Sequence, residues 1–298
     1  MFLADKYSLL APLHPKAHSQ GKAAAAGPTA RFDAALAARL RGLLPLPSSS
    51  PLAALARLAD LLALTLGDAA AALAGEGDAA AVAAHLDAGV ALLDACNAIT
   101  ARLERLRRRR LLARFALHLL SSSSVGRARA ALADRDGAAS PPPPLPSLPF
   151  DQPPRGRLSG AARVLVAVNA VSSLAAAAAA AILGGGVSAA AAFPLVVVSG
   201  DFPWADAFNA VSSQLSALAT NAREVDAIDE AVQKLASVLD GERGVHEAAQ
   251  EVEKRTEELT ARLDRLADAV NGVFRAALCL RNAELGSFMV GPAENTCK

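Results

Sequence analysis

Few residues of this chain have the types and the spacing that chemistry requires. His14 and His18 are four residues apart, but Pro15 lies between them, so they do not form a helical pair of metal ligands. The segment GGGVS (184–188) follows no predicted strand and lacks the lysine of a phosphate-binding loop. Neither a GxSxG nor an HExxH motif occurs. We therefore predict a non-enzymatic protein with no catalytic, cofactor-binding or metal-binding residues.

The clustered carboxylates and the other histidines have simpler explanations than chemistry. Four acidic residues share a predicted helix with opposite charges nearby, so we expect them to form a solvated face: Glu224, Asp226, Asp229 and Glu230. His85 and His118 lie on another predicted helix, and we expect them at its surface or boundary. Only a deep polar pocket lined by Asp94, Asn97 and His118 would favour an enzyme that acts on a small apolar metabolite.

The cysteines and the net charge limit the kinds of partner. The chain has an odd number of cysteines, and none of them form a CxxC pair: Cys96, Cys279 and Cys297. This pattern is typical of proteins in a reducing compartment, and it argues against disulfide bonds and thiolate metal sites. The formal net charge is only +1, so the chain lacks the basic excess of a nucleic-acid-binding protein. We expect protein partners that bind helical surfaces, with a membrane as an alternative partner. Neither nucleic acid nor a small-molecule ligand is predicted.

The sequence RLRRRR (105–110) is the densest run of charge. Four successive arginines sweep about 300° around a helix, so they cannot all face one partner. One interpretation is a solvated collar in which Arg110 extends from the buried face of the helix to water. The alternative is a patch for nuclear import or for anionic lipid.

The elements that carry these residues are predicted to be helices. Hydrophobic residues make up 53% of the chain but aromatic residues only 4%, so much of the apolar content is alanine, which favours closely packed helices. A chain of 298 residues suffices for one large or two modest domains. We predict an all-α protein, an elongated helical bundle with long, coiled-coil-like antiparallel helices.

The spacing of apolar residues locates the helices. A first helix is predicted over 29–45, and Ser50 before Pro51 indicates the start of a second, which runs to about Leu66. Residues 82–120 keep one heptad pattern, which predicts a helix of about 55 Å at ~1.5 Å per residue. Residues 204–239 and the stretch that follows a turn at 240–244 are predicted to form an antiparallel hairpin of two long helices.

A proline-rich stretch divides the chain. It contains PPPPLPSLP, which predicts an extended spacer or, through its PxxP spacing, a ligand for an SH3-type domain. The N-terminal tail is predicted to be disordered, with a plastid transit peptide as the alternative. The predicted regions are a disordered tail (1–28), an N-terminal helical region (29–135), a proline-rich linker (136–158), an apolar helix with a glycine-rich break (159–200), a helical hairpin (201–286) and a flexible tail (287–298).

The stretch VLVAVNAVSSLAAAAAAAIL (164–183) carries no charge over twenty residues, which is long enough to span ~30 Å of hydrocarbon. Its leucines, isoleucine and valines favour insertion by about 3.5 kcal/mol in all, and Asn169, Ser172 and Ser173 oppose it by a similar amount. Two alternatives remain, a buried helix at the centre of the bundle and a membrane segment. The membrane segment would include Val164, Leu165, Val168, Leu174, Ile182 and Leu183.

At VALLDACNAITARLERLRRRRLLARFALHLL (90–120) the chain resembles a plant family, the BYPASS-type proteins and their exocyst-interacting relatives, which are grouped as a plant domain of unknown function. FDAALAARLRGLLP resembles the opening helix of the family. FPWADAFNAVSSQL is similar to its Pro-x-Trp-Ala helix start, and LDRLADAVNGVFRAALCLRNAELGSF to its closing helix. The most specific piece is LLDACNAI. The resemblance thus gives four candidate interaction or family-motif residues: Asp94, Cys96, Asn97 and Trp204.

The resemblance implies a non-enzymatic regulator of plant development that acts on root and shoot through control of a root-derived mobile signal. Some relatives are linked to exocyst subunits, so a membrane-anchored adaptor of exocyst-type secretion is the alternative. Several relatives are expected to have one transmembrane helix. The expected location is the cytoplasm or an endomembrane, with the plastid as a further alternative.

Overall fold

The computed structural model describes residues 27–73, 79–134, 144–150, 156–184, 193, 195–220, 224–239 and 244–289. Within these ranges the chain forms eight α-helices and no β-strand, so the prediction of an all-α protein is confirmed. The helices are α1 (Pro28–Leu43), α2 (Pro51–Leu73), α3 (Ala79–Ser121), α4 (Val125–Asp134), α5 (Gly160–Leu183), α6 (Ala205–Thr220), α7 (Glu224–Val238) and α8 (Val245–Met289).

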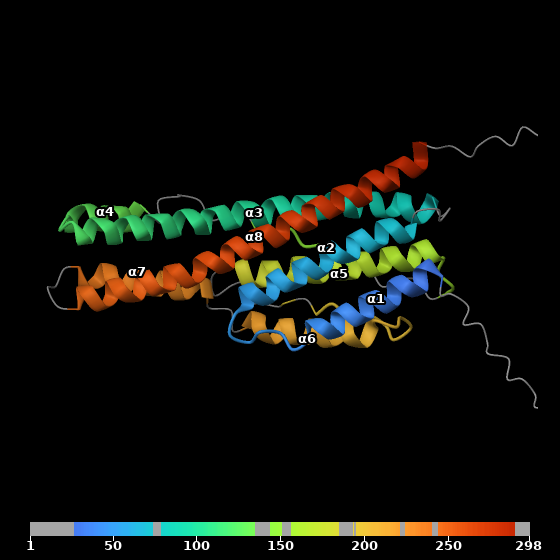
Figure 1. Ribbon diagram of the computed structural model, residues 1–298, viewed down its shortest axis with the longest axis horizontal. Helices are drawn as coiled ribbons and strands as arrows, with labels where there is room; N and C mark the ends of the chain where they lie inside the picture. The colour runs from blue at the N-terminus through green and yellow to red at the C-terminus, as the bar shows by residue number, and fades with distance from the viewer. Residues whose placement is uncertain are drawn as a thin grey trace, which may run out of the picture.

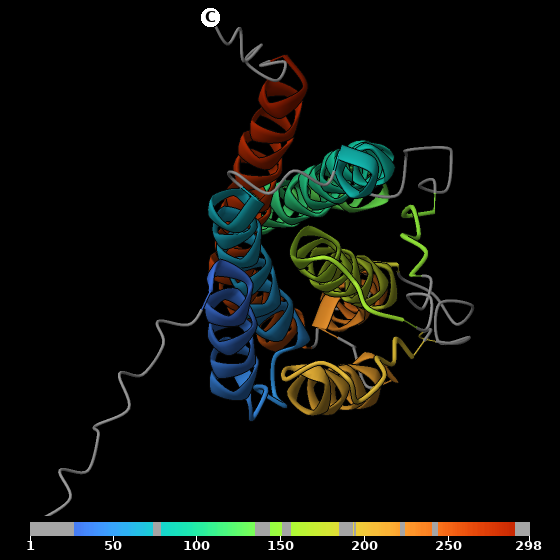
Figure 2. The ribbon, with the colours of Figure 1, turned by 90° about the vertical axis from the view of Figure 1, so that its right-hand side faces the viewer.

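The helix α8 runs between the two ends of the molecule (Figure 1). It packs most extensively against α2 and α3, and it also packs against α7. One end of the molecule contains α4, which folds back on α3, together with α7. The other end contains α1, α2, α5 and α6. Viewed end-on, α5 lies among α2, α3 and α6, all of which contact it (Figure 2), so α5 is the central helix of this end.

Serine side chains fix the starts of two of these helices. Ser50 Oγ accepts a hydrogen bond from the backbone N–H of Ala53 at 3.2 Å, which confirms Ser50 as the N-cap of α2. Ser159 Oγ accepts one from the N–H of Ala162 at 3.1 Å and caps α5 in the same way. Each cap satisfies one N–H group that the helix itself leaves unpaired.

The end of α3 lies in the serine run at 121–124. Ser123 adopts a left-handed backbone conformation with φ of 61°. Its N–H donates to the carbonyl of Leu120, and the N–H of Ser124 donates to the carbonyl of Leu119, a pairing typical of helix C-termini. The chain therefore reverses, and α4 packs along α3. The helix α4 lies inside the N-terminal helical region predicted over 29–135, although the spacing of apolar residues placed no individual helix there.

The heptad pattern identified the buried face of α3 correctly. Seven of its positions are at most 6% exposed: Val82, His85, Leu92, Cys96, Leu103, Leu106 and Ala113. The second helix is longer than predicted, because α2 continues through the alanines after Gly67 to Leu73. The predicted C-terminal tail also begins later, since α8 continues to Met289.

The prediction of one helix over 204–239 was wrong, because two helices, α6 and α7, occupy this range. The apolar residues of α6 (Phe208, Val211, Leu215) and those of α7 (Ile228, Val232, Leu235) are all buried. On one straight helix these two sets would face directions roughly 125° apart. As separate helices they pack on different partners, α6 on α1 and α5, and α7 on α8. Of these two helices, α7 is therefore the one that packs extensively against α8.

The apolar helix α5 is largely buried by its neighbours. All six residues predicted for a membrane segment, Val164, Leu165, Val168, Leu174, Ile182 and Leu183, are at most 5% exposed. Two described helices, α3 and α5, are nevertheless long and apolar enough to cross a membrane. This is weak evidence for membrane association, because the buried core helix of a soluble protein meets the same criterion.

Several predictions concern residues outside the described ranges. They include the N-terminal tail up to residue 26, with His14 and His18, most of the glycine-rich break, the turn residues 240–243, and residues 290–298 with Cys297. Of the proline-rich linker, residues 144–150 and 156–158 are described, and they are not helical.

Candidate functional site

The motif LLDACNAI lies on α3 and presents its residues to two different environments. Cys96 is buried and lines an apolar cleft of about 30 Å³ that Leu55, Ser172 and Leu266 also line. Burial raises the pKa of the Cys96 thiol to about 11, so the thiol stays protonated at neutral pH. A neutral buried thiol is a poor nucleophile and a poor metal ligand, and Cys96 therefore acts as a core residue.

Asp94 and Asn97 lie on the outer face of the same helix, where both are exposed. They belong to a row in which exposed residues alternate at intervals of four and three: Val90, Asp94, Asn97, Ala101 and Glu104. His118 is exposed further along α3, as predicted. Asp94 and His118 are 24 residues apart on this one helix, which separates them by about 36 Å at ~1.5 Å per residue. These exposed residues therefore do not line one common polar pocket.

Trp204 lies far along the chain and is fully buried just before α6. Its Nε1–H donates a hydrogen bond to Asp33 Oδ1 at 3.2 Å, and Arg163 Nη2 donates to Asp33 Oδ2 at 3.0 Å. The Arg163 guanidinium also lies 5.1 Å from the centre of the Phe202 ring. Asp33, Arg163 and Trp204 thus tie α1, α5 and the start of α6 together. Trp204 is a packing residue, and it does not share a site with Asp94, Cys96 and Asn97.

The prediction that His85 lies at the surface or the boundary of its helix was wrong, because the side chain is buried. His85 on α3 and Glu284 on α8 are each 4% exposed, and His85 Nε2 lies 3.7 Å from Glu284 Oε1. Burial lowers the pKa of His85, and an interaction with the Asn169 amide partly opposes this effect. Burial raises the pKa of Glu284 to about 7, and Arg281 opposes that shift. The heptad pattern of α3 gave a signal for His85, because position 85 falls on the buried row.

A cleft of about 390 Å³ opens between α3 and α5 near these polar residues. Asp87, Asn169 and Ser172 supply polar atoms to its walls, and Phe150 and Val166 supply apolar surface. Ser172 Oγ is buried and has no hydrogen-bond partner among the described atoms. The cleft therefore offers acceptor groups but no basic side chain.

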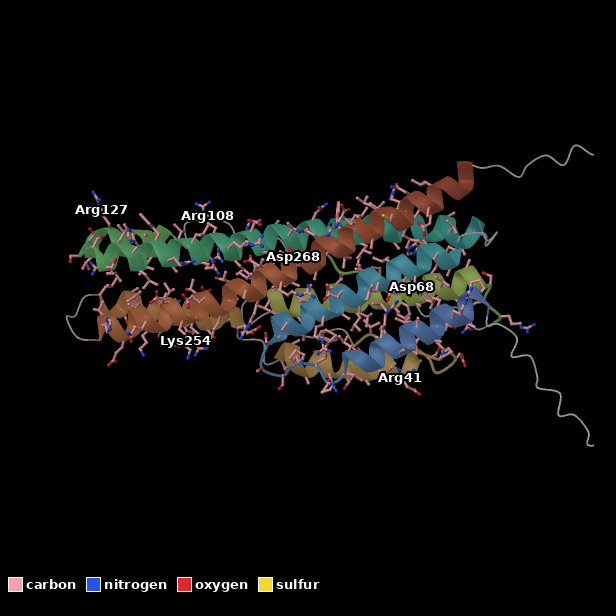
Figure 3. The ribbon with its side chains drawn as sticks, viewed as in Figure 1. Arg41, Asp68, Arg108, Arg127, Lys254 and Asp268 are labelled. Atoms are coloured by element: carbon pink, nitrogen blue, oxygen red, sulfur yellow. The ribbon has the colours of Figure 1, made fainter. Side chains whose placement is uncertain are left out.

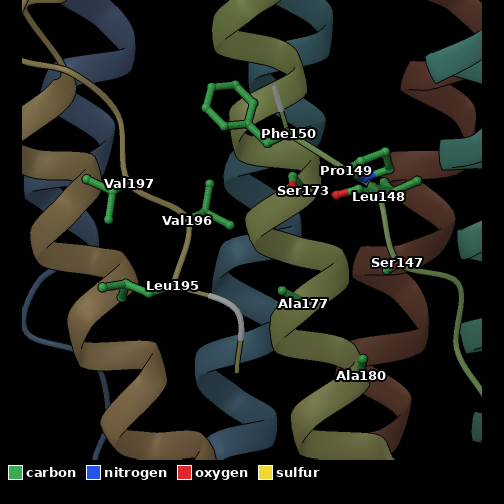
Figure 4. A pocket seen from close by; sticks show the side chains of 10 residues that line it. All are labelled: Ser147, Leu148, Pro149, Phe150, Ser173, Ala177, Ala180, Leu195, Val196 and Val197. Atoms are coloured by element: carbon green, nitrogen blue, oxygen red, sulfur yellow. Dashed lines mark hydrogen bonds between the residues drawn. The ribbon is translucent and has the colours of Figure 1, made fainter. Parts of the chain in front are cut away.

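A second cleft, of about 530 Å³, is also lined by Leu148, Pro149 and Phe150, together with residues of α5 and residues 195–197 (Figure 4). In Figure 4 the segment 147–150 runs along one side of α5, and residues 195–197 run along the other side. Ser173 Oγ donates a hydrogen bond to the Leu148 carbonyl at 2.6 Å and holds the segment on α5. The amide of Asn209 holds the opposite segment, because it accepts from the N–H and donates to the carbonyl of Val198. Both clefts are thus bounded by extended chain attached to α5 or α6.

The arginine run faces several directions, as its spacing predicts, but it is not simply a solvated collar. Arg107 bonds Glu104 at 2.6 Å and Asp264 of α8 at 2.9 Å, and Arg109 bonds Asp229 of α7 at 3.1 Å. Arg110 Nε is buried without a described partner. Arg105 and Arg108 are exposed. The run therefore contributes both internal ion pairs and outward charge.

Arg102, one turn before the run, has a role that the sequence did not indicate. Its Nε and Nη2 donate to the carbonyls of Leu183 and Gly184, each at 2.8 Å, at the C-terminus of α5. Burial lowers the pKa of Arg102, and repulsion from Arg109 and Arg105 lowers it further, but an arginine stays charged at neutral pH. A cation at this position satisfies carbonyls that the helix leaves unpaired and complements its dipole.

The predicted solvated face of carboxylates also needs correction. Glu224 accepts a hydrogen bond from the N–H of Leu52 at 2.8 Å, in the first turn of α2, and forms an ion pair with Arg262. Asp229 forms the ion pair with Arg109. Glu224 and Asp229 therefore join helices, whereas Glu230 is exposed. Within the described ranges, no group of three or more histidine, cysteine or acidic side chains is suited to hold a metal ion.

The chain matches no protein-family model, no curated protein and no solved structure.

Proposed function

We propose that the protein is a non-enzymatic regulator of plant development of the BYPASS type, which acts through helix-mediated protein interaction and takes part in the control of a mobile signal. The observation that supports this proposal is the orientation of LLDACNAI. Cys96 packs in the core, whereas Asp94 and Asn97 extend into solvent from the outer face of α3. Exposed polar side chains contribute little to folding and are free to contact a partner.

The outer face of α3 suits a partner helix. Val90, Asn97 and Ala101 are exposed in the alternating row, and a second helix that lies along this row would meet one residue of the row at each turn. Ala101 is small and permits close approach, and Asp94 and Glu104 supply charges that fix the register. We further propose that α7 and α8 pair as an antiparallel coiled coil, which keeps α3 straight because α3 packs along α8.

This proposal is tested by affinity capture from plant extract with the full chain, followed by quantitative mass spectrometry. The variant Asp94→Lys/Asn97→Lys is expected to lose partners that the wild type retains, exocyst subunits among them if the secretion alternative is correct. The matched control is Glu257→Lys/Asn282→Lys, which makes the same change of charge at exposed positions of α8. If the Asp94/Asn97 variant retains the same partners as the control, this face of α3 is not the interaction surface.

A membrane-anchored adaptor is the second candidate function, and one property of α5 favours it. The helix is 24 residues long and apolar enough to span a membrane, although 67% of its most apolar stretch is buried inside the protein. Carbonate and detergent washes of isolated membranes test this candidate. An anchored protein resists carbonate and is released by detergent. Recovery in the soluble fraction would exclude the anchor.

A further inference from the structure

The most unusual surface of the molecule is the α3–α4 tip, which we define as residues 105–121 of α3 together with α4. Residues 105–134 contain eight arginines and one acidic residue, Asp134, although the whole chain has a net charge of only +1. In Figure 3, Arg108 of α3 and Arg127 of α4 both extend from the same side of the molecule, away from the bundle. Positive charge is therefore concentrated on α3 and α4 at this end of the molecule, whereas most acidic residues of this end lie on α7 and α8.

Some arginines of the tip form ion pairs with neighbouring helices, and others do not. Arg107 and Arg109 form ion pairs with α8 and α7, and Arg110 has its Nε buried. By contrast, Arg105, Arg108, Arg114 and Arg127 are exposed and have no ion pair with any residue in the described ranges. Ion pairs with that part of the chain therefore do not explain why these outward arginines are present.

Large apolar side chains are also exposed to solvent at the tip. Leu111 is 56% exposed and Phe115 is 53% exposed, one helical turn apart on α3, and Val125 at the start of α4 is 43% exposed. At 100° per residue, Arg108 and Arg114 lie within about 60° of Leu111, one on each side. Ala113 and Ala116 on the opposite face are fully buried, so the orientation of α3 is fixed by packing. An apolar strip with arginines on both sides is thus built into the outer face of the tip.

We propose that the α3–α4 tip docks on the surface of a membrane that contains anionic lipids. Arginine guanidinium groups bind lipid phosphates and carboxylates, while leucine and phenylalanine enter the boundary between headgroups and acyl chains. Each arginine near an anionic leaflet favours binding by a factor of about five. Apolar residues in the middle of the basic face favour lipid over nucleic acid, whose phosphate backbone offers them no complementary surface. The docking requires neither α5 nor the outer row that contains Asp94 and Asn97.

The test is co-sedimentation of the purified full chain with vesicles of phosphatidylcholine alone and of phosphatidylcholine mixed with phosphatidylserine. The protein is expected to bind only the mixed vesicles and to dissociate at high salt, because salt screens the attraction. Arg108→Gln/Arg114→Gln/Arg127→Gln is expected to weaken binding about a hundredfold, by the factor of about five per arginine. The charge-matched control, Arg31→Gln/Arg41→Gln/Lys254→Gln, changes exposed residues elsewhere and is expected to bind like the wild type.

A second pair of variants tests the apolar strip. Leu111→Ser/Phe115→Ser is expected to weaken vesicle binding at least tenfold, through loss of apolar burial. The control Leu64→Ser/Leu278→Ser changes two exposed leucines outside the tip and is expected to bind normally. Far-UV circular dichroism verifies that every variant keeps its helices.

Equal binding to both kinds of vesicle, or unchanged binding of the tip variants, would overturn the proposal. So would binding of a DNA oligonucleotide that requires the arginines but not Leu111 and Phe115, without binding of vesicles. Asp94→Lys/Asn97→Lys is expected to bind vesicles normally, and the tip variants are expected to keep the partners found by affinity capture. Failure of the tip proposal is therefore distinguishable from failure of the proposed function.

Discussion

Replacement of Glu284 by glutamine is expected to stabilise the protein at alkaline pH and to have a smaller effect at acidic pH. The carboxyl is buried between α8 and α3, and burial raises its pKa from 4.5 to about 7. Since the folded state holds the proton more tightly than the unfolded state, the protonated carboxyl contributes stability that is fully present below pH 4.5. This contribution is lost as the pH rises through 7.

The size of the effect follows from the two pKa values. The difference between 4.5 and about 7 corresponds to about 3 kcal/mol of unfolding free energy, lost by pH 8. Glutamine has the same shape and no charge, so the variant avoids this loss. His85 acts in the opposite sense, because its lowered pKa gives stability that is present above pH 6.5 and is lost as the pH falls. This contribution is common to wild type and variant and largely cancels when the two are compared.

The measurement is urea unfolding of wild type and Glu284→Gln, followed by circular dichroism at pH 4.5 and pH 8. The difference in unfolding free energy between the two proteins is expected to grow by about 3 kcal/mol in favour of the variant over this range. Any constant effect of the amide cancels in the comparison. Glu257→Gln, at an exposed position of the same helix, is the control and is expected to show no such growth. A difference that is the same at both pH values would refute the assignment of Glu284 as a buried acid.

Three further substitutions test individual contacts by thermal or urea unfolding. Trp204→Phe removes the hydrogen bond from Nε1 to Asp33 and is expected to destabilise the protein by about 1–3 kcal/mol, because the buried carboxylate keeps only Arg163. Asn209→Ala removes both bonds to the Val198 backbone, and it is expected to lower stability by about 1–2 kcal/mol and to speed hydrogen exchange of the Val198 amide. Arg102→Met leaves the carbonyls of Leu183 and Gly184 without their donor and is expected to reduce stability by about 1–2 kcal/mol, whereas Arg108→Met at an exposed position is expected to have an effect below about 0.5 kcal/mol.

The sequence predicted where the helices lie better than it predicted which helices pack against each other. The heptad pattern over 82–120 indicated the helix and its buried face because both depend on the local spacing of Leu92, Leu103 and Leu106. The pattern over 204–239 was misleading, since a gap in the spacing permits either a bent helix or two helices. Which of these forms depends on α1 and α5, which are remote in the sequence.

In the candidate sites too, the sequence predicted features of a single helix but not the contacts between helices. The spacing of α3 places Asp94 and Asn97 away from Cys96, so their exposure was predictable in principle. The contacts of Arg102 with Leu183, of His85 with Glu284 and of Ser173 with Leu148 were not, because they join residues from 25 to about 200 positions apart. Side-chain contacts of this kind depend on how helices cross, which the spacing of apolar residues along one helix does not determine.

The buried position of α5 distinguishes two modes of membrane association, insertion of α5 and docking of the α3–α4 tip. Its apolar side chains are already removed from water inside the bundle, so transfer into lipid adds little hydrophobic free energy. Insertion would break the bonds of Arg102 to Leu183 and Gly184, place Asn169 and Ser172 in hydrocarbon, and expose the faces of α2 and α6 that α5 covers. Docking through the α3–α4 tip breaks none of these contacts. Hydrogen exchange with anionic vesicles separates the two cases: tip docking is expected to slow exchange in residues 108–127 and to leave α2 and α6 protected, whereas faster exchange throughout α2 and α6 would indicate insertion of α5.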